Sequence, residues 1–212
     1  MSAVPRLHLI GPLGLVKPVE FLGVATRAAA GGCDAVHLRM RDLSGGDALR
    51  MARSLRRELA AFPGTKLIVN DRLDVALMAM ADGVQLGERG FEVEDARQLI
   101  GGHKLIGRSI HDVQGARHAE EAGASFLIAG HIYDTPSKEG EEGRGLDWLA
   151  EIVSAVESPV IAIGGINLKR LPEVLATGAH GVALGRELLT AADPYEIAKR
   201  AIRTIEQEGA DS

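Results

Sequence analysis

The feature of this sequence that most constrains its fold is a recurring phrase, in which small residues typical of a helix end run through glycine into a short apolar stretch. The phrase occurs at 28–39 (AAAGGCDAVHLR), 79–87 (AMADGVQLG), 120–130 (EEAGASFLIAG) and 175–185 (LATGAHGVALG). Glycine after the last helical turn supplies the left-handed conformation that commonly ends a helix. The apolar stretch is typical of a strand buried on both faces. The phrase therefore indicates repeated helix-to-strand joints of a parallel α/β protein.

Further apolar runs fill the gaps between these phrases, at 7–10, 66–70, 104–107 and 159–164, and bring the expected strands to eight. Helical patterns lie between them at 18–31, 46–61, 73–80, 93–100, 112–122, 146–156, 168–176 and 187–207. About 26 residues for each unit suits a single (βα)8 TIM barrel over residues 1–212, with a tail that frays after about residue 208. A doubly wound open sheet is the alternative, but no G-x-G-x-x-G follows the first strand.

Composition and charge exclude several kinds of partner. The chain has 24 Lys and Arg against 29 Asp and Glu and only 3% aromatic residues, so we expect no nucleic-acid partner. The single cysteine, Cys33, cannot form an internal disulfide and fits a reducing compartment. No uncharged run approaches the roughly 18 residues of a bilayer span, so we expect no membrane partner and a cytoplasmic location. We also expect Cys33, Leu77, Met78 and Met80 to be buried in the core.

Polar residues follow almost every expected strand, at the end of the barrel where this fold builds its active sites. Cations are frequent there although the protein is acidic overall, which favours an anionic substrate. Which of the cations Arg39, Arg41, Arg72, Arg89 and Lys138 contact the ligand stays open. The expected substrate-binding residues are Arg39, Arg41, Asn70, Asp71, Ser109, Thr135 and Lys138.

Glycines follow the last two expected strands, at the positions where barrel enzymes commonly hold a phosphate group. A glycine backbone can approach an anion closely because no Cβ atom intervenes. We therefore expect Gly164, Gly165, Gly185 and Arg186 to bind phosphate. The alternative is that both turns simply need positive φ angles.

His131 follows the apolar run 126–130 and should project at the mouth of the barrel. A neutral imidazole is a natural carrier of a proton between two substrate atoms. The alternative is a histidine bonded to its own loop. His111 is a weaker candidate, and His8 and His37 lie within strand runs, where buried histidines with satisfied hydrogen bonds are more common.

Seven segments in order resemble the thiamine phosphate synthase/TenI superfamily over roughly residues 7–195. They are HLRMRD (37–42), LIVNDRLDVAL (67–77), GVQLGERGFEVEDAR (83–97), GRSIHD (107–112), AGHIYDTPSKEGEEGRGL (129–146), VIAIGGI (160–166) and the stretch from GVALG to AADP (181–194). The resemblance implies a (βα)8 barrel, which agrees with the reading of the strands above.

The resemblance also bears on the branch of the superfamily. Synthases join a pyrimidine pyrophosphate to a thiazole phosphate and hold Mg²⁺ with two aspartates. The first is present here as Asp71, but Gly90 stands at the position of the second, with Glu88 as a displaced substitute. The REK signature of synthases reads Arg39-Met40-Arg41. TenI-type thiazole tautomerases instead carry GHxxxT, as Gly130 to Thr135 do here.

The resemblance thus implies a thiazole tautomerase with His131 as the catalytic acid and base. It would isomerise the exocyclic-alkene tautomer of carboxythiazole phosphate to the aromatic thiazole, with no metal or cofactor. The expected partner is this small phosphorylated thiazole carboxylate, and a homo-oligomer is expected. Two alternatives remain: a Mg²⁺-dependent thiamine phosphate synthase, and a non-catalytic regulatory barrel that binds a phosphate ligand.

Overall fold

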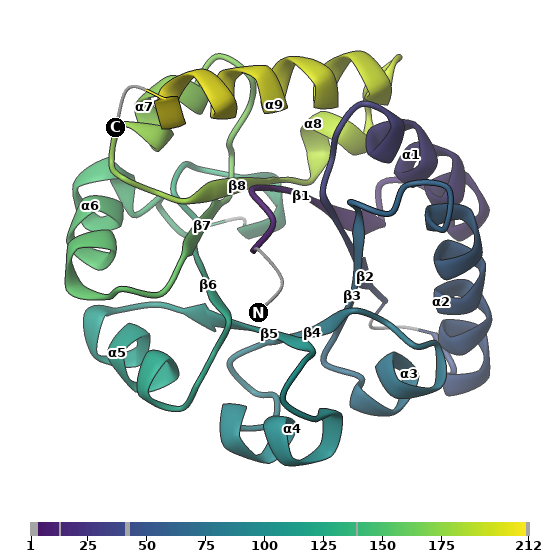
Figure 1. The fold of residues 1–212 in the computed structure, drawn as a ribbon. Helices are drawn as coiled ribbons and strands as arrows, with labels where there is room; N and C mark the ends of the chain where they lie inside the picture. The colour runs from purple at the N-terminus through teal and green to yellow at the C-terminus, as the bar shows by residue number, and fades with distance from the viewer. Residues whose placement is uncertain (1–3, 13, 41–42, 139, 211–212) are drawn as a thin grey trace.

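The strands close into a barrel in the computed structural model, which describes residues 4–12, 14–40, 43–138 and 140–210. All of them are parallel, each pairs with the next in the chain, and the last pairs with the first (Figure 1). The (βα)8 prediction is confirmed. The strands are β1 (Leu7–Pro12), β2 (Ala35–Arg39), β3 (Lys66–Asn70), β4 (Gly83–Leu86), β5 (Leu105–Ile110), β6 (Phe126–Gly130), β7 (Val160–Ile163) and β8 (Gly181–Leu184).

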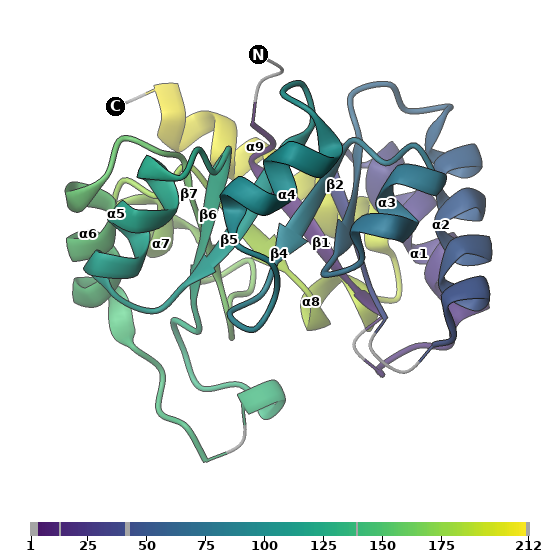
Figure 2. The ribbon, with the colours of Figure 1, turned by 90° about the horizontal axis from the view of Figure 1, so that it is seen from below.

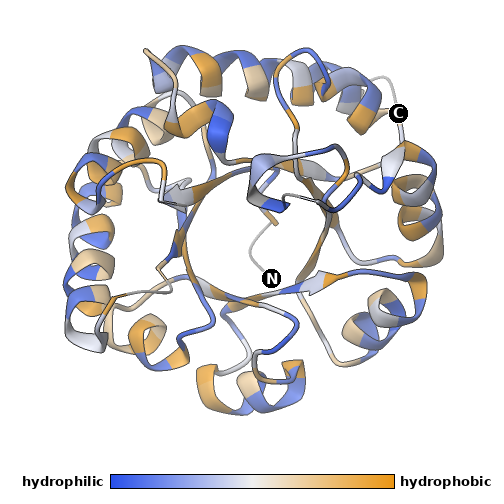
Figure 3. Cartoon of the chain, turned by 180° about the vertical axis from the view of Figure 1, so that it is seen from behind, coloured by the Kyte–Doolittle hydropathy of each residue, from blue (hydrophilic) through white to orange (hydrophobic). Residues whose placement is uncertain are grey.

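Helices surround this barrel and carry hydrophobic and hydrophilic residues side by side (Figures 1 and 3), as expected where a helix buries one face. None of the helices in the described ranges is long and apolar enough to cross a bilayer. They are α1 (Pro18–Ala30), α2 (Gly45–Leu59), α3 (Leu73–Met78), α4 (Val93–Ile100), α5 (Val113–Glu121), α6 (Gly145–Ala155), α7 (Leu171–Leu175), α8 (Arg186–Leu189), α9 (Pro194–Ala210) and a short 3-10 helix η1 (Pro136–Lys138).

Alternation along each strand divides the apolar residues into two cores. One core lies between the strands and the helices and includes Leu9 and Leu67. The other fills the barrel interior and includes Ile10, Ile68 and Leu105. Successive side chains of a strand point to opposite faces, so residues two apart share a face. Asn70 therefore points inward like Ile68, and Ser109 points inward like Leu105. On β2 the buried His37 points inward, and so does Arg39 at the mouth.

Two expectations about the helices are wrong. The helix expected at 187–207 is two helices, because Pro194 has no N–H and Asp193 begins a new helix by accepting from the backbone of Tyr195 at 3.0 Å. Leu77, Met78 and Met80 are exposed rather than buried. Helix α3 spans only six residues, and it buries Leu73, Val75 and Ala76 on its inner face, so the residues that follow lie outside.

Candidate active site at the mouth of the barrel

The carboxyl ends of the strands form the mouth of the barrel, on the side opposite the amino end of β1. Figure 2 shows the long segment between β6 and α6 extending away from the barrel on that side. Arg39, Asn70 and Ser109 end or nearly end their strands there, and all three are half-buried. The structure therefore brings these three expected site residues to one end of the barrel. Arg41 lies outside the described residues.

Asp71 shapes the loop that follows β4. Its backbone has a φ of 60°, in the left-handed region that, apart from glycine, short polar residues such as Asn and Asp adopt most readily. Its Oδ1 atom accepts a hydrogen bond from the backbone N–H of Gly87 at 2.8 Å. A Cβ atom on Gly90 would lie 3.4 Å from the same oxygen. A carboxylate at position 90 would thus lie beside the Asp71 carboxylate. Because position 90 is glycine in this chain, Asp71 has no second carboxylate from that position.

The β6–α6 segment is closed at its base. The backbone N–H groups of Arg144 and Gly145 donate to the carbonyls of His131 and Ile132, each at 3.0 Å. Within this closed loop His131 is only 8% exposed, and its Nε2 lies 3.3 Å from the carbonyl oxygen of Glu141. This geometry is that of a histidine bonded to its own loop. Thr135 is half-buried just before η1.

Lys138 lies at the outer part of the same segment, at the end of η1. Its side chain is 49% exposed, and its ammonium group is 3.1 Å from a carboxylate oxygen of Glu141. Asp134 braces the segment by accepting from the backbone N–H of Gly143 at 2.7 Å. Lys138 is thus an exposed cation that reaches the mouth only from the overhanging loop.

The glycine pair after β7 packs directly under this loop. Gly164 and Gly165 have φ angles of 103° and 65°, and a Cβ on either would overlap His131 or Tyr133. The carbonyl of Gly164 accepts from the N–H of Tyr133 at 3.1 Å, and that of Gly165 accepts from Arg170 at 2.6 Å. Because N–H and C=O point in opposite directions across a trans peptide, the amides of Gly165 and Ile166 point away from these partners. They are suitable donors to an anion.

Gly185 and Arg186 lie after β8. Gly185 has a negative φ of -88° and precedes α8, which begins at Arg186. The first turn of a helix leaves backbone N–H groups without intrahelical acceptors. The side chain of Arg186 is exposed, so the backbone N–H groups are the candidate phosphate donors at this turn.

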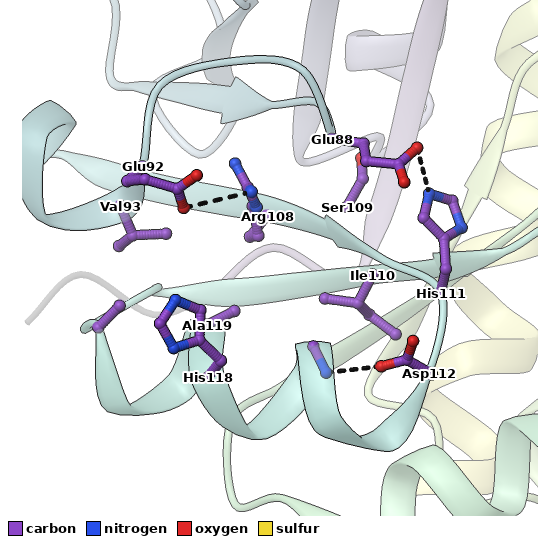
Figure 4. Close-up of a pocket in the computed structure, with 12 residues that line it drawn as sticks. Glu88, Glu92, Val93, Arg108, Ser109, Ile110, His111, Asp112, His118 and Ala119 are labelled. Carbon is purple, nitrogen blue, oxygen red and sulfur yellow. Dashed lines mark hydrogen bonds and ion pairs between the residues drawn. The ribbon is translucent and has the colours of Figure 1, made fainter.

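A cavity of about 170 Å³ lies beside the mouth, between α4 and α5 (Figure 4). Its charged groups pair with one another: His111 is 3.6 Å from Glu88, and Arg108 is 3.4 Å from Glu92. The carbonyl of His111 also accepts from the Arg144 side chain at 2.8 Å, which ties this loop to the β6–α6 segment. Asp112, which also lines the cavity, accepts from the backbone N–H of Gly115, so the lining holds three carboxylates, one arginine and two histidines.

Two residues at the mouth were not among the expected site residues. Gln85, 2% exposed, lies inside the barrel, and its Nε2 donates to Ser109 Oγ at 3.1 Å and to the Leu86 carbonyl at 3.2 Å. The sequence indicates this residue only by the presence of a polar glutamine within the apolar run GVQL. Arg170 stacks over the ring of Tyr133, 4.1 Å from its centroid. Its position as the N-cap residue of α7 gave no indication of this contact, because the contact depends on the β6–α6 loop.

The fold and the mouth define a single (βα)8 barrel whose polar end combines a loop-bound aspartate, inward polar side chains and a glycine turn with outward amides. The family model described as thiamine monophosphate synthase matches residues 8–188. The chain belongs to this family, and the superfamily resemblance is confirmed.

Similar proteins specify the family further. A thiamine-phosphate synthase from Myxococcus xanthus is 37% identical over 214 residues, covering 98% of both chains. One from Roseiflexus is 38% identical, covering 86% of this chain and 77% of the relative. The solved structure of a thiamine phosphate pyrophosphorylase from Pyrococcus furiosus is 31% identical with a TM-score of 0.86, over 96% of both chains. A 3-hexulose-6-phosphate synthase at 18% identity and a TM-score of 0.73 shares the fold alone.

These relatives overturn the prediction of a thiazole tautomerase. They match most of the chain and carry the synthase name, although the chain has the Gly130-His131 pair on which the prediction rested. The structure supplies a physical reason for the error, because the pair serves the packing of the loop: His131 lies on Gly164 and bonds within its own segment. The protein is an enzyme of thiamine biosynthesis, and the isomerase assignment is wrong.

Proposed function

We propose that the protein is a thiamine phosphate synthase, which joins a pyrimidine pyrophosphate to a thiazole phosphate and releases pyrophosphate. The observation that carries the proposal is the set of curated synthases that are 35–43% identical over most of the chain. The mouth supports it, because its cations, inward polar groups and outward amides suit two phosphorylated ligands.

The thiazole phosphate is assigned to the glycine end of the mouth. The amides of Gly165 and Ile166 donate to its phosphate oxygens, and the backbone at Gly185 and Arg186 contributes from the next strand. Backbone donors fit this task because they are fixed before the ligand arrives and require no ordering of long side chains.

The pyrimidine pyrophosphate is assigned to the opposite wall, formed by β2, β3 and β5. Arg39 supplies charge-assisted hydrogen bonds to the pyrophosphate, and Asn70 and Ser109 bind neutral groups. Lys138 and Thr135 contact the ligand from the β6–α6 segment. Arg41 is proposed as a further cation that binds the pyrophosphate. The two anions then lie on facing sides of one mouth, with the reacting atoms between them.

A magnesium ion is the metal that the family implies. No group of three or more His, Cys, Asp and Glu side chains suited to a metal occurs among the described residues. Mg²⁺ is nevertheless often held by one or two carboxylates together with substrate phosphates and water. Asp71 fits the role of single protein ligand, since Gly87 engages only its Oδ1 atom. When bound, Mg²⁺ neutralises charge on the departing pyrophosphate.

The reaction asks this chain to bind and orient rather than to move protons. A bond forms between the thiazole ring nitrogen and the methylene carbon of the pyrimidine, while the bond from that carbon to pyrophosphate breaks. The ring nitrogen attacks with its lone pair, so its attack requires no general base. Positioning and stabilisation of the leaving group supply the catalysis. His131, buried within its loop, holds the shape of the segment that covers the ligands.

Growth provides a test of the proposal in a cell. A bacterial strain that lacks its own thiamine phosphate synthase is given this protein and grown without thiamine. We expect growth, and we expect it to be lost with Asp71→Ala. Absence of growth while the protein is present and folded would overturn the proposal.

A further inference from the structure

A chain of polar side chains runs through the barrel interior from its base to its mouth. His8 on β1 and His37 on β2 are fully buried, and His8 Nδ1 lies 2.8 Å from His37 Nε2. The other nitrogen of His8, Nε2, lies 2.9 Å from the carbonyl oxygen of Pro5. Asn70 lies at the carboxyl end of β3, the strand that pairs with β2, and is the polar side chain next to the His37 ring. Phe126 packs edge-on against both rings.

These contacts fix which nitrogen of each ring carries a hydrogen. Burial lowers the pKa of both histidines, to about 4 for His8, so both rings are neutral at neutral pH. A carbonyl oxygen can only accept, so His8 Nε2 donates to Pro5, and His8 Nδ1 is an acceptor. His37 Nε2 must then donate to His8, which leaves His37 Nδ1 without a hydrogen. This Nδ1 atom is buried and has no hydrogen-bond partner within the described part of the chain.

Asn70 completes the chain in only one orientation of its amide. Its Oδ1 atom is likewise buried and without a partner among the residues described, and two acceptors cannot bond to each other. The oxygen and nitrogen of an amide differ little in size, and hydrogen-bond partners decide which is which. A half-turn of the amide lets Asn70 Nδ2 donate to His37 Nδ1 and turns Oδ1 toward the mouth.

We propose that His8 and His37 are positioning residues that hold the Asn70 amide with its oxygen toward the mouth, where it accepts from an N–H or O–H group of the substrate. The contact with substrate rests on the proposed function, whereas the direction of the three hydrogen bonds does not. Gln85 pairs with Asn70 in register on β4. Its Nε2 is engaged, and its buried Oε1 has no partner in the described ranges. This oxygen lies beside Gly107 inside the barrel, whereas Nε2 faces Ser109, so Gln85 offers no acceptor toward the mouth.

Nitrogen-15 NMR of the histidine side chains in the full chain tests the relay without any substrate. We expect both His8 and His37 to carry their hydrogen on Nε2 at neutral pH. In Asn70→Asp the carboxylate cannot donate, so we expect His37 to gain a hydrogen on Nδ1. A wild-type His37 protonated on Nδ1, or an unchanged His37 spectrum in Asn70→Asp, overturns the proposal.

Kinetics test the consequence for the substrate. In His8→Phe, His37 loses the acceptor for its Nε2 hydrogen, so we expect that hydrogen on Nδ1 and the Asn70 oxygen turned inward. KM for the pyrimidine pyrophosphate should rise about tenfold, equivalent to about 1.4 kcal/mol, while kcat changes less. Phe126→Leu, which alters the same interior packing but leaves the relay intact, is the matched control. Equal effects of the two variants on KM overturn the proposal.

The two measurements separate this inference from the proposed function. If the chain makes no thiamine phosphate but the NMR spectra show the expected hydrogens, the relay stands and the proposed function fails. If the chain makes thiamine phosphate and His37 carries its hydrogen on Nδ1, the relay fails and the function stands.

Discussion

The guanidinium group of Arg170 donates to the carbonyl oxygen of Gly165 at 2.6 Å. The same group stacks on the ring of Tyr133, whose hydroxyl donates to Glu173 at 2.6 Å. Arg170 therefore joins the β6–α6 segment to the turn after β7. This hydrogen bond holds the peptide between Gly165 and Ile166, whose N–H group we propose as a donor to the phosphate.

Loss of this contact should weaken binding of the thiazole phosphate. In Arg170→Ala the Gly165 carbonyl is no longer held, so we expect KM for thiazole phosphate to rise about tenfold and kcat to change less. Arg50→Ala, which removes an exposed arginine paired with Asp47 on α2, is the control and should match the parent. Steady-state kinetics with each substrate varied in turn would refute the role of Arg170 if its KM stayed at the parent value.

Gly165→Ala tests the glycine turn itself. The φ of 65° is unfavourable for alanine, and the new Cβ would lie 2.7 Å from Tyr133 Cβ and 2.8 Å from the Asp134 carbonyl oxygen. We expect KM for thiazole phosphate to rise by about tenfold or more. Gly123→Ala has a comparable φ of 85° with nothing within 4 Å, so it should cost stability without changing KM. Identical kinetic constants in the two variants would remove the phosphate assignment.

Chelation tests the role of Asp71. We expect turnover to stop in EDTA and to return when Mg²⁺ is added in excess, because a single carboxylate and the substrate hold the ion. Asp71→Asn should raise the Mg²⁺ concentration needed for half-maximal activity by about tenfold. Glu88→Gln is the control, since Glu88 is largely exposed and pairs with His111. A Mg²⁺ titration in which Glu88→Gln shifts and Asp71→Asn does not would reassign the ligand.

The buried histidines predict a loss of stability in acid. Burial holds the pKa of His8 at about 4, below its usual value of 6.5. Between these values the unfolded chain binds a proton that the folded chain excludes, so the free energy of unfolding rises with pH across this window and falls as acid is added. His8 alone should cost on the order of 3 kcal/mol by about pH 4. Urea unfolding of the parent and His8→Phe should therefore diverge with pH, and parallel losses would contradict the account.

The strand positions could be predicted from the sequence because each buried strand of the barrel is a short apolar run, and several of these runs follow a glycine. The prediction of 66–70 coincides with β3, and the glycine phrases mark β2, β4, β6 and β8. The break between α8 and α9 was less visible, since the apolar periodicity continues across residues 190–193. The expected burial of Met78 and Met80 was wrong because other residues fill the inner face of the six-residue helix α3, so Met78 at its end and Met80 just beyond it lie outside.

The candidate site could be predicted only in part. Residues that directly follow strands, such as Asn70, Asp71 and Ser109, were expected because the fold itself gathers them at one end. Contacts between distant segments left no local signal: His8 and His37 meet only through the register of β1 and β2. The choice of branch failed because it rested on the Gly130-His131 pair and on Gly90 in place of the second aspartate, and both occur in a chain whose relatives carry the synthase name.

Formation of thiamine phosphate by the purified protein is the decisive test of the proposed synthase activity. The purified protein is supplied with pyrimidine pyrophosphate, thiazole phosphate and Mg²⁺, and thiamine phosphate and pyrophosphate are quantified together, with each substrate omitted in turn. The account predicts that the two products appear in equal amounts and only when both substrates are present. Tight binding of both substrates without either product would contradict it.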